Sequence, residues 1–160
     1  MEKTNAIRKL DTRKIKYEIK AYTYDPENLS VEKIAEANKM EVTTIYKTLI
    51  AKGDRTGILI AVVPGNLALD LKALAKASRN KKITLVPVNE IQKITGYIRG
   101  GCSPLGMKKN FPVYMDEAVN KLDLVYVNAG QRGLLFGVKP TDLQTVTRAE
   151  ICPISKIVDE

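Results

Sequence analysis

The stretches TIYKTLIA, residues 44–51, and GILIAVV, residues 57–63, decide the fold of this chain. Both are rich in β-branched and apolar residues, and the intervening KGDRT is typical of a turn, which predicts two successive strands. A period of two divides the first strand between two faces. One face carries Ile45, Lys47, Leu49 and Ala51, and the other carries Tyr46, Thr48 and Ile50.

Lys47 is the unusual member of its row. An ammonium group that points toward a protein core must pair with a negative charge, have a shifted pKa, or face a cleft that holds a negative ligand. The alternative is a partly solvated face, or a side chain that follows its apolar stem out to water. The two-residue period by itself favours this alternative. The choice between the two interpretations therefore depends on residues elsewhere in the chain.

In the rest of the chain, the spacing of hydrophobic residues alternates between that of helices and that of strands. The chain shows no linker and no internal repeat. This pattern predicts an α/β (mixed) fold in a single domain over residues 1–160. Ser30 is a candidate N-cap and Pro140 a candidate first residue of a helix. Helices are expected at residues 5–10, 31–39, 69–77, 88–94 and 141–146, and further strands at 17–22, 83–86, 113–115, 124–127, 134–138 and 151–154.

The chain has no histidine, which removes the usual general base near neutral pH and every Ser/His or Cys/His arrangement. Its 26 basic and 18 acidic residues give a net charge of +8. This charge favours a polyanion partner such as nucleic acid, although solvated lysine-rich faces also occur on proteins that bind none. No helix-turn-helix, zinc or RNA-recognition signature is present.

The two cysteines, Cys102 and Cys152, are too few and too far apart for a disulfide framework or a zinc site. The best apolar run, residues 58–63, ends at Pro64 and is far shorter than a membrane span, and no charged-then-apolar leader opens the chain. We therefore expect a soluble, cytoplasmic protein with no metal and no membrane partner.

The segment TGYIRGGCSPLG, residues 95–106, is the strongest candidate for a binding loop. Its glycines let backbone N–H groups approach an anionic or ester-bearing ligand, and Arg99 adds a fixed positive charge. The alternative is a plain connection whose glycines only supply positive φ angles. Because the loop follows an expected helix, its position does not match a dinucleotide or P-loop cradle, where glycines precede the helix.

Four blocks of this sequence together resemble the YbaK/prolyl-tRNA synthetase-associated family. They are YKTL at residues 46–49, VPG at 63–65 followed by LDLK at 69–72, the loop at 95–106, and YV at 126–127 leading into GQRGL at 130–134. The resemblance implies a mixed β-barrel-like sheet flanked by helices. It also implies a metal-independent and cofactor-free hydrolase in translation, which edits mischarged aminoacyl-tRNA in trans. Cys-tRNA(Pro) is the main substrate expected, with tRNA and prolyl-tRNA synthetase as partners.

The resemblance also implies roles for individual residues. Lys47 matches the essential lysine, which we expect to orient the terminal adenosine or its phosphate and to stabilise developing negative charge. Gly100 and Gly101 match a glycine pair that offers backbone N–H groups near the scissile carbonyl. Tyr22 and Thr48 match residues that line the substrate pocket. The substrate's own thiol or a ribose hydroxyl assists attack in the cysteine-specific members, and a deprotonated Lys47 is the other route to a base.

Three more residues of the blocks, Tyr97, Arg99 and Asn128, are predicted to bind substrate. Many family members carry serine where this chain has Asn128, and Gln131 replaces a frequent basic residue. Asparagine brings both a donor and an acceptor, so the amino acid that is removed could differ. We interpret Cys102 as a small buried residue and not as a nucleophile.

Alternative functions remain open at this point. The first is a deacylase for another small amino acid such as alanine. The second is a non-catalytic module that binds tRNA or aminoacyl-tRNA and has lost hydrolysis. The third is an unrelated small-molecule or nucleotide-binding domain whose basic faces are only solvated.

Overall fold

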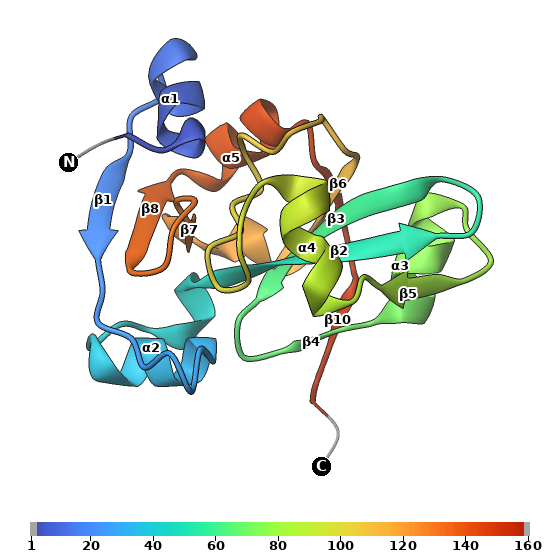
Figure 1. Cartoon of the computed structure of the whole chain (residues 1–160), viewed down its shortest axis with the longest axis horizontal. Helices are drawn as coiled ribbons and strands as arrows, with labels where there is room; N and C mark the ends of the chain where they lie inside the picture. Colours follow the sequence, from blue (N-terminus) through green and yellow to red (C-terminus); the bar gives the residue numbers. More distant parts are fainter. Residues whose placement is uncertain (1–2, 159–160) are drawn as a thin grey trace.

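A computed structural model describes residues 3–158 of the chain. Its main sheet is built around the two strands expected at residues 44–51 and 57–63 (Figure 1). Strands β2 (Tyr46–Gly53) and β3 (Gly57–Pro64) pair antiparallel, with Lys47 opposite Val63. The sheet has the order β5-β2-β3-β6-β9. Its other strands are β5 (Ile83–Leu85), β6 (Val113–Asp116) and β9 (Glu150–Cys152), and the last two run parallel to β3.

A second sheet lies beside the first, in the order β1-β8-β7. It consists of β1 (Glu18–Ala21), β8 (Leu134–Val138) and β7 (Val125–Asn128), all antiparallel. A bridge between Ile45 and Tyr126 connects it to the start of β2. The short strands β4 (Ala68–Leu69) and β10 (Ser155–Lys156) form a third pair. The mixed α/β class is confirmed, and within residues 3–158 the strands form three sheets and no closed barrel.

Three of the five α-helices in the described residues begin after a side-chain N-cap. The Ser30 hydroxyl accepts a hydrogen bond from the Lys33 N–H at the start of α2 (Val31–Ala37), and Asp70 caps α3 (Leu71–Ser78) in the same way. Thr4 caps α1 (Asn5–Thr12), and α5 (Pro140–Thr147) starts at its proline. The remaining helices are α4 (Val88–Thr95) and the 3₁₀ turns η1 (Val42–Thr44) and η2 (Glu117–Lys121).

Most predicted boundaries move by one or two residues. The strand expected from residue 44 starts at Tyr46, because Thr44 closes the 3₁₀ turn η1 with its N–H bonded to the Glu41 carbonyl. The order of helix α4 followed by the glycine loop is confirmed. Among the described helices, none combines the length and apolar character that a membrane crossing requires.

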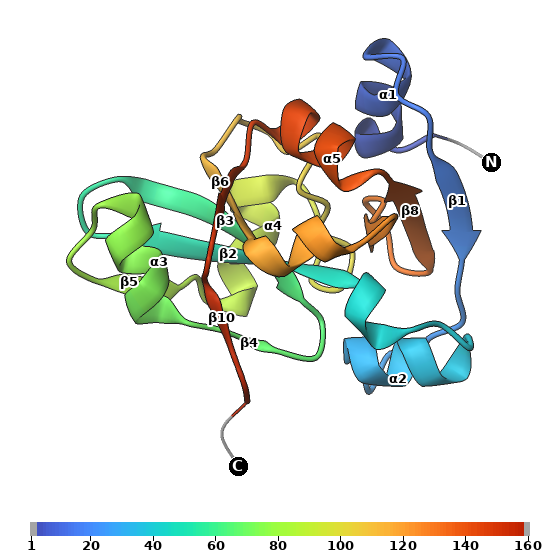
Figure 2. The same cartoon turned by 180° about the vertical axis from the view of Figure 1, so that it is seen from behind.

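Strand β2 separates two layers of the core, as its alternation predicts. Tyr46 and Ile50 belong to the main core beneath α1, α5 and the second sheet. Ala51, with Leu49 at its margin, packs in a smaller cluster under α3 on the opposite face of the sheet. Figure 2 shows α3 on that side of the molecule. Lys47 lies in the Leu49 row near the end of β2 that α3 leaves uncovered, and it is half-buried.

Candidate active site

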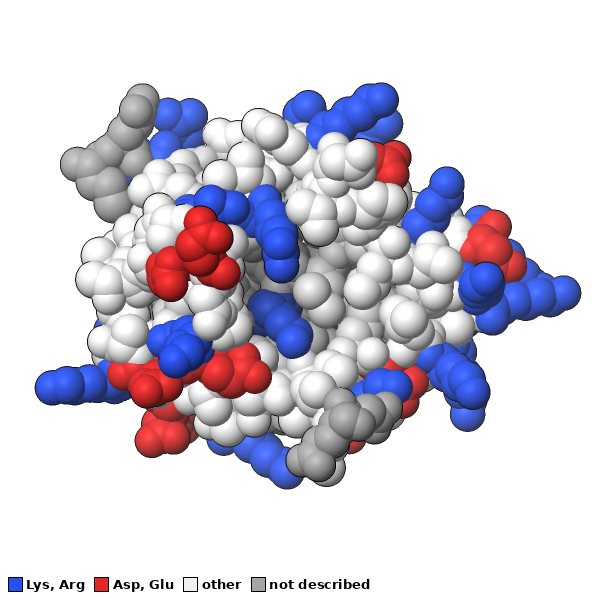
Figure 3. Space-filling view, turned by 60° about the horizontal axis from the view of Figure 1, so that its bottom comes forward, with Lys and Arg blue, Asp and Glu red and all other residues white. Residues whose placement is uncertain are grey.

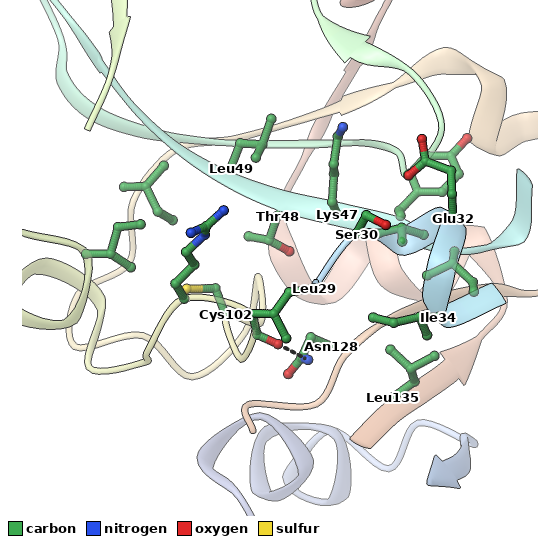
Figure 4. A pocket seen from close by; sticks show the side chains of 18 of the residues that line it. Leu29, Ser30, Glu32, Ile34, Lys47, Thr48, Leu49, Cys102, Asn128 and Leu135 are labelled. Carbon is green, nitrogen blue, oxygen red and sulfur yellow. Dashed lines mark hydrogen bonds between the residues drawn. The ribbon is translucent and has the colours of Figure 1, made fainter. Parts of the chain in front are cut away.

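A cavity of about 600 Å³ opens beside the first half of β2. Its walls come from the first turns of α2 and the segment before it, from the β5–α4 connection, from the second sheet, and from Arg99, Gly100 and Cys102. The mouth is visible as a hollow with basic side chains in it (Figure 3). Its walls are largely aliphatic, with Leu29, Ile34, Leu49, Val86 and Leu135 among the lining residues (Figure 4).

Lys47 supplies a cation to this cavity. Burial lowers the pKa of its ammonium group, and the carboxylate of Glu32 in the opposite wall acts in the reverse direction. Over residues 3–158 the only ion pair within 4.0 Å joins Lys3 and Asp11, so Lys47 has no carboxylate partner there. Figure 4 shows its side chain rising from β2 between Leu49 and Glu32. Of the interpretations that the sequence left open, the structure therefore shows a half-buried ammonium group at a cleft, without an ion-pair partner among the described residues.

Gly100 lines the same cavity, whereas Gly101 does not. Gly100 has a φ of +81°, which explains the need for glycine there. The N–H of Gly101 donates to the Ile98 carbonyl at 2.9 Å, and a Cβ at this residue would meet the Gln131 backbone at 3.2 Å. The structure thus differs from the prediction that both glycines present N–H groups to a substrate, because Gly101 is used to close the loop and to pack on its neighbour.

Tyr97 is also outside the lining of the cavity. Its ring is buried, and its hydroxyl donates to the Leu105 carbonyl at 2.7 Å. This contact ties the beginning of the glycine loop to its end. The predicted substrate contact of Tyr97 would therefore have to be made from outside this cavity, whereas Arg99 lines the mouth and is exposed.

Asn128 joins three parts of the site through its amide. Its Nδ2 donates to the Gly100 carbonyl at 2.8 Å and to the Tyr22 hydroxyl at 3.2 Å, and its Oδ1 accepts from the Gly130 N–H at 2.7 Å. The dashed line in Figure 4 marks the first of these bonds. The Arg132 Nε donates to the Arg99 carbonyl at 2.9 Å. The last residue of β7 and the turn after this strand thereby hold the glycine loop at two successive carbonyl groups.

Arg132 and Leu29 are site residues that sequence reasoning did not single out. Both would approach a Cβ at Gly100, with Leu29 Cδ1 at 3.0 Å and Arg132 Nε at 3.2 Å. Arg132 lies inside the quoted GQRGL block, so the signal for it was present. Nothing in the sequence marks Leu29, whose position depends on how the segment before α2 folds back over the loop.

Tyr22 and Thr48 both line the cavity, and their contact with a substrate stays a prediction from the resemblance. Burial raises the pKa of the Tyr22 hydroxyl, which favours its protonated form. The Thr48 Oγ1 is buried and has no hydrogen-bond partner among the described residues. An unsatisfied buried hydroxyl costs about 1–3 kcal/mol, so a polar ligand atom that reached it would be stabilised.

Neither thiol is suited to nucleophilic attack. Cys102 borders the cavity, but burial raises the pKa of its thiol, and its Sγ donates to the Ile98 carbonyl at 3.4 Å. Burial and nearby carboxylates raise the pKa of Cys152 to about 11, and this residue belongs to the cluster under α3. In the described part of the chain, no three His, Cys, Asp or Glu residues come together as metal ligands.

The arrangement can therefore hold an anionic or ester-bearing ligand. Lys47 and Arg99 supply positive charge, the aliphatic wall accepts a small apolar group, and the Gly100 position brings backbone close to the ligand. A cation in partly desolvated surroundings stabilises negative charge that develops beside it more strongly than a cation in water does.

Comparisons with known proteins show the family of this chain. The model of the aminoacyl-tRNA editing domain family matches residues 25–146. EbsC of Enterococcus faecalis, provisionally named as a Cys-tRNA(Pro)/Cys-tRNA(Cys) deacylase, is 41% identical over 96% of this chain and 94% of its own length. A proline–tRNA ligase of a Sulfurihydrogenibium species is 27% identical over 68% of this chain, which corresponds to 19% of the ligase.

A solved structure supports the fold independently. It is provisionally described as a trans-editing enzyme for prolyl-tRNA synthetase, and it superposes with a TM-score of 0.81 at 24% identity. The match covers 98% of this chain and 99% of the other.

Proposed function

Because the chain belongs to the aminoacyl-tRNA editing domain family, we propose that it hydrolyses the ester bond of mischarged aminoacyl-tRNA in trans, with Cys-tRNA(Pro) as its main substrate. The observation that carries the proposal is the unpaired ammonium of Lys47 in an aliphatic cavity that Gly100 also lines. A synthetase pocket distinguishes small apolar side chains by only about 1–3 kcal/mol, so a second, hydrolytic site is needed to remove the wrong amino acid.

The substrate determines what the protein must supply. An aminoacyl ester is already activated, so a bound water molecule can attack its carbonyl carbon without a strong enzymic base. The carbon–oxygen bond to the ribose then breaks, the ribose oxygen takes a proton, and the free amino acid leaves. A thiol or ribose hydroxyl of the substrate can relay the proton, which fits a chain without histidine.

In this proposal, the protein acts by position and charge. Lys47 stabilises the negative charge that develops at the carbonyl oxygen or holds the terminal phosphate, and Arg99 holds the strand at the mouth. Gly100 brings the backbone of the loop to the cavity wall, while Thr48 and Tyr22 line the pocket. Asn128 positions Gly100 and Tyr22 through hydrogen bonds and therefore acts through them.

The proposal places the protein in the cytoplasm, where mischarged tRNA would otherwise enter translation. tRNA(Pro) is the specific tRNA partner, and prolyl-tRNA synthetase is the enzyme whose errors are corrected. The similarity to a segment of a proline–tRNA ligase supports this link.

The test is a panel of tRNA(Pro) charged with cysteine, alanine or proline and incubated with the pure protein. We expect release of cysteine to be fastest and proline to be retained, and we expect Lys47→Ala to abolish release. The same panel with a metal chelator should give unchanged rates. Tight tRNA binding with no release of any amino acid would contradict the proposal and indicate a non-catalytic binding module.

A further inference from the structure

The two sides of the cavity mouth carry opposite charge. Residues 25–41, which include α2 and form one side, contain five acidic and two basic side chains, all exposed. Residues 79–99, which include β5 and α4 on the other side, contain five basic side chains and one acidic side chain, again all exposed. In Figure 3, acidic side chains lie beside the hollow at the left, on the α2 side. Basic side chains gather at the right end of the molecule, beyond the opposite side of the hollow. A polyanion that enters this mouth therefore meets repulsion on one side and attraction on the other.

An apolar platform lies between the mouth and the basic end. Leu85 and Val88 line the cavity, yet 52% and 57% of their surfaces remain exposed. Exposed large aliphatic side chains at the edge of a site are typical of surfaces that a ligand covers. Flat bases of a single strand gain favourable contact on such a surface without sequence-specific hydrogen bonds.

The basic end is built around the turn between β2 and β3. Lys52 lies opposite Thr84 in the β2–β5 pairing, which brings it beside the Lys81-Lys82 segment. The Asp54 carboxylate accepts from the backbone N–H groups of Lys81 and Lys82 at 2.8 and 3.0 Å. Asp54 thus anchors the backbone of the two lysines, while their exposed side chains remain available to phosphate groups.

We propose that the RNA strand leaves the cavity over the β5–α4 side, with unpaired bases against Leu85 and Val88 and phosphates held by Lys52, Lys81 and Lys82. This inference rests on the proposed function, because it takes the ligand of the cavity to be the 3′ end of a tRNA. On the opposite side of the mouth, formed by α2, the acidic side chains repel the same RNA strand. The mouth thereby sets the direction in which the tRNA lies.

The test measures binding of uncharged tRNA, which requires no hydrolysis, at several salt concentrations. Lys81→Glu/Lys82→Glu should weaken binding by about tenfold or more and reduce the slope of log K against log salt by about 2, one for each lost phosphate contact. Leu85→Ser/Val88→Ser should weaken binding without changing the slope, because the platform contacts bases and not phosphates. Circular dichroism and urea unfolding show whether each variant is folded.

The matched control is Lys16→Glu/Lys139→Glu, which makes the same change in net charge at two exposed residues that belong to neither side of the mouth and do not line the cavity. We expect the control to bind within about twofold of the unmodified protein at moderate salt, where long-range effects are screened. Equal weakening by the control and by the Lys81/Lys82 variant would overturn the inference. If no mischarged tRNA is hydrolysed but this pattern of binding holds, the proposed function fails while the docking side stands.

Discussion

Replacing Asn128 by aspartate is the sharpest test of how the glycine loop is held. The substitution keeps the size of the side chain and the acceptor for the Gly130 N–H at 2.7 Å. It removes the donor to the Gly100 carbonyl at 2.8 Å and the donor to the Tyr22 hydroxyl at 3.2 Å. It also places a carboxylate oxygen against a carbonyl oxygen.

The magnitude follows from these two bonds. Each hydrogen bond contributes about 0.5–1.5 kcal/mol, so their loss should lower the free energy of unfolding by about 1–3 kcal/mol. If the loss of these hydrogen bonds mainly displaces the loop in the transition state, kcat should decrease by about tenfold for each 1.4 kcal/mol. We therefore expect Asn128→Asp to reduce kcat for Cys-tRNA(Pro) by about 10- to 100-fold, with a smaller change in KM.

The assay combines urea unfolding with steady-state deacylation. Gln131→Glu is the matched control, because it changes an amide to a carboxylate three residues away on an exposed side chain. We expect this control to keep nearly full activity and stability. Unchanged kcat in Asn128→Asp, or an equal loss in Gln131→Glu, would refute the conclusion that the amide of Asn128 positions the loop.

Three further predictions concern the cavity. Burial lowers the pKa of Lys47, so folding disfavours the charged form of this side chain. The free energy of unfolding should therefore rise as the pH increases from the lowered pKa of the folded protein to the ordinary lysine pKa of the unfolded chain. Lys47→Met should remove this pH dependence in urea unfolding and be at least as stable as the unmodified protein at pH 7, while deacylation is lost; retained activity would contradict its role. Gly100→Ala should lose more stability and activity than Gly57→Ala, since both have a positive φ but only Gly100 would also crowd Leu29, and equal losses in unfolding and rate measurements would argue against this contact. Cys102→Ser should keep most of the deacylase activity, because burial holds the thiol protonated; an inactive but folded variant would indicate a nucleophile.

Local sequence determined the elements and much of their order. The alternation of residues 44–51 placed Tyr46 and Ile50 on one layer of the core and Leu49 on the other, as the structure confirms. Ser30 caps its helix as predicted, because an N-cap needs only its own side chain and the next turn. The resemblance of the four blocks led to the family, which the matching family model and a 41% identical relative confirm.

The structure brings some of the predicted site residues to one cavity and leaves others outside its lining. Lys47, Thr48 and Gly100 line one cavity, although the roles assigned to them remain predictions. Gly101 and Tyr97 lie outside the cavity lining, and their hydrogen bonds to Ile98 and Leu105 depend on how the loop closes on itself. Sequence spacing does not reveal which N–H or O–H group a loop has already used.

The sequence by itself determined the secondary structure, the absence of a histidine base and the residue types that can act in the cavity, because these follow from short-range patterns and composition. Tertiary structure alone decided that Asn128 reaches Gly100, that Arg132 reaches Arg99, and that acidic and basic segments flank the mouth on opposite sides. The two hydrogen bonds join residues 28 and 33 positions apart. Their geometry is fixed by how the second sheet, α2 and the glycine loop pack around β2, and packing of that kind leaves no periodic signal in the chain.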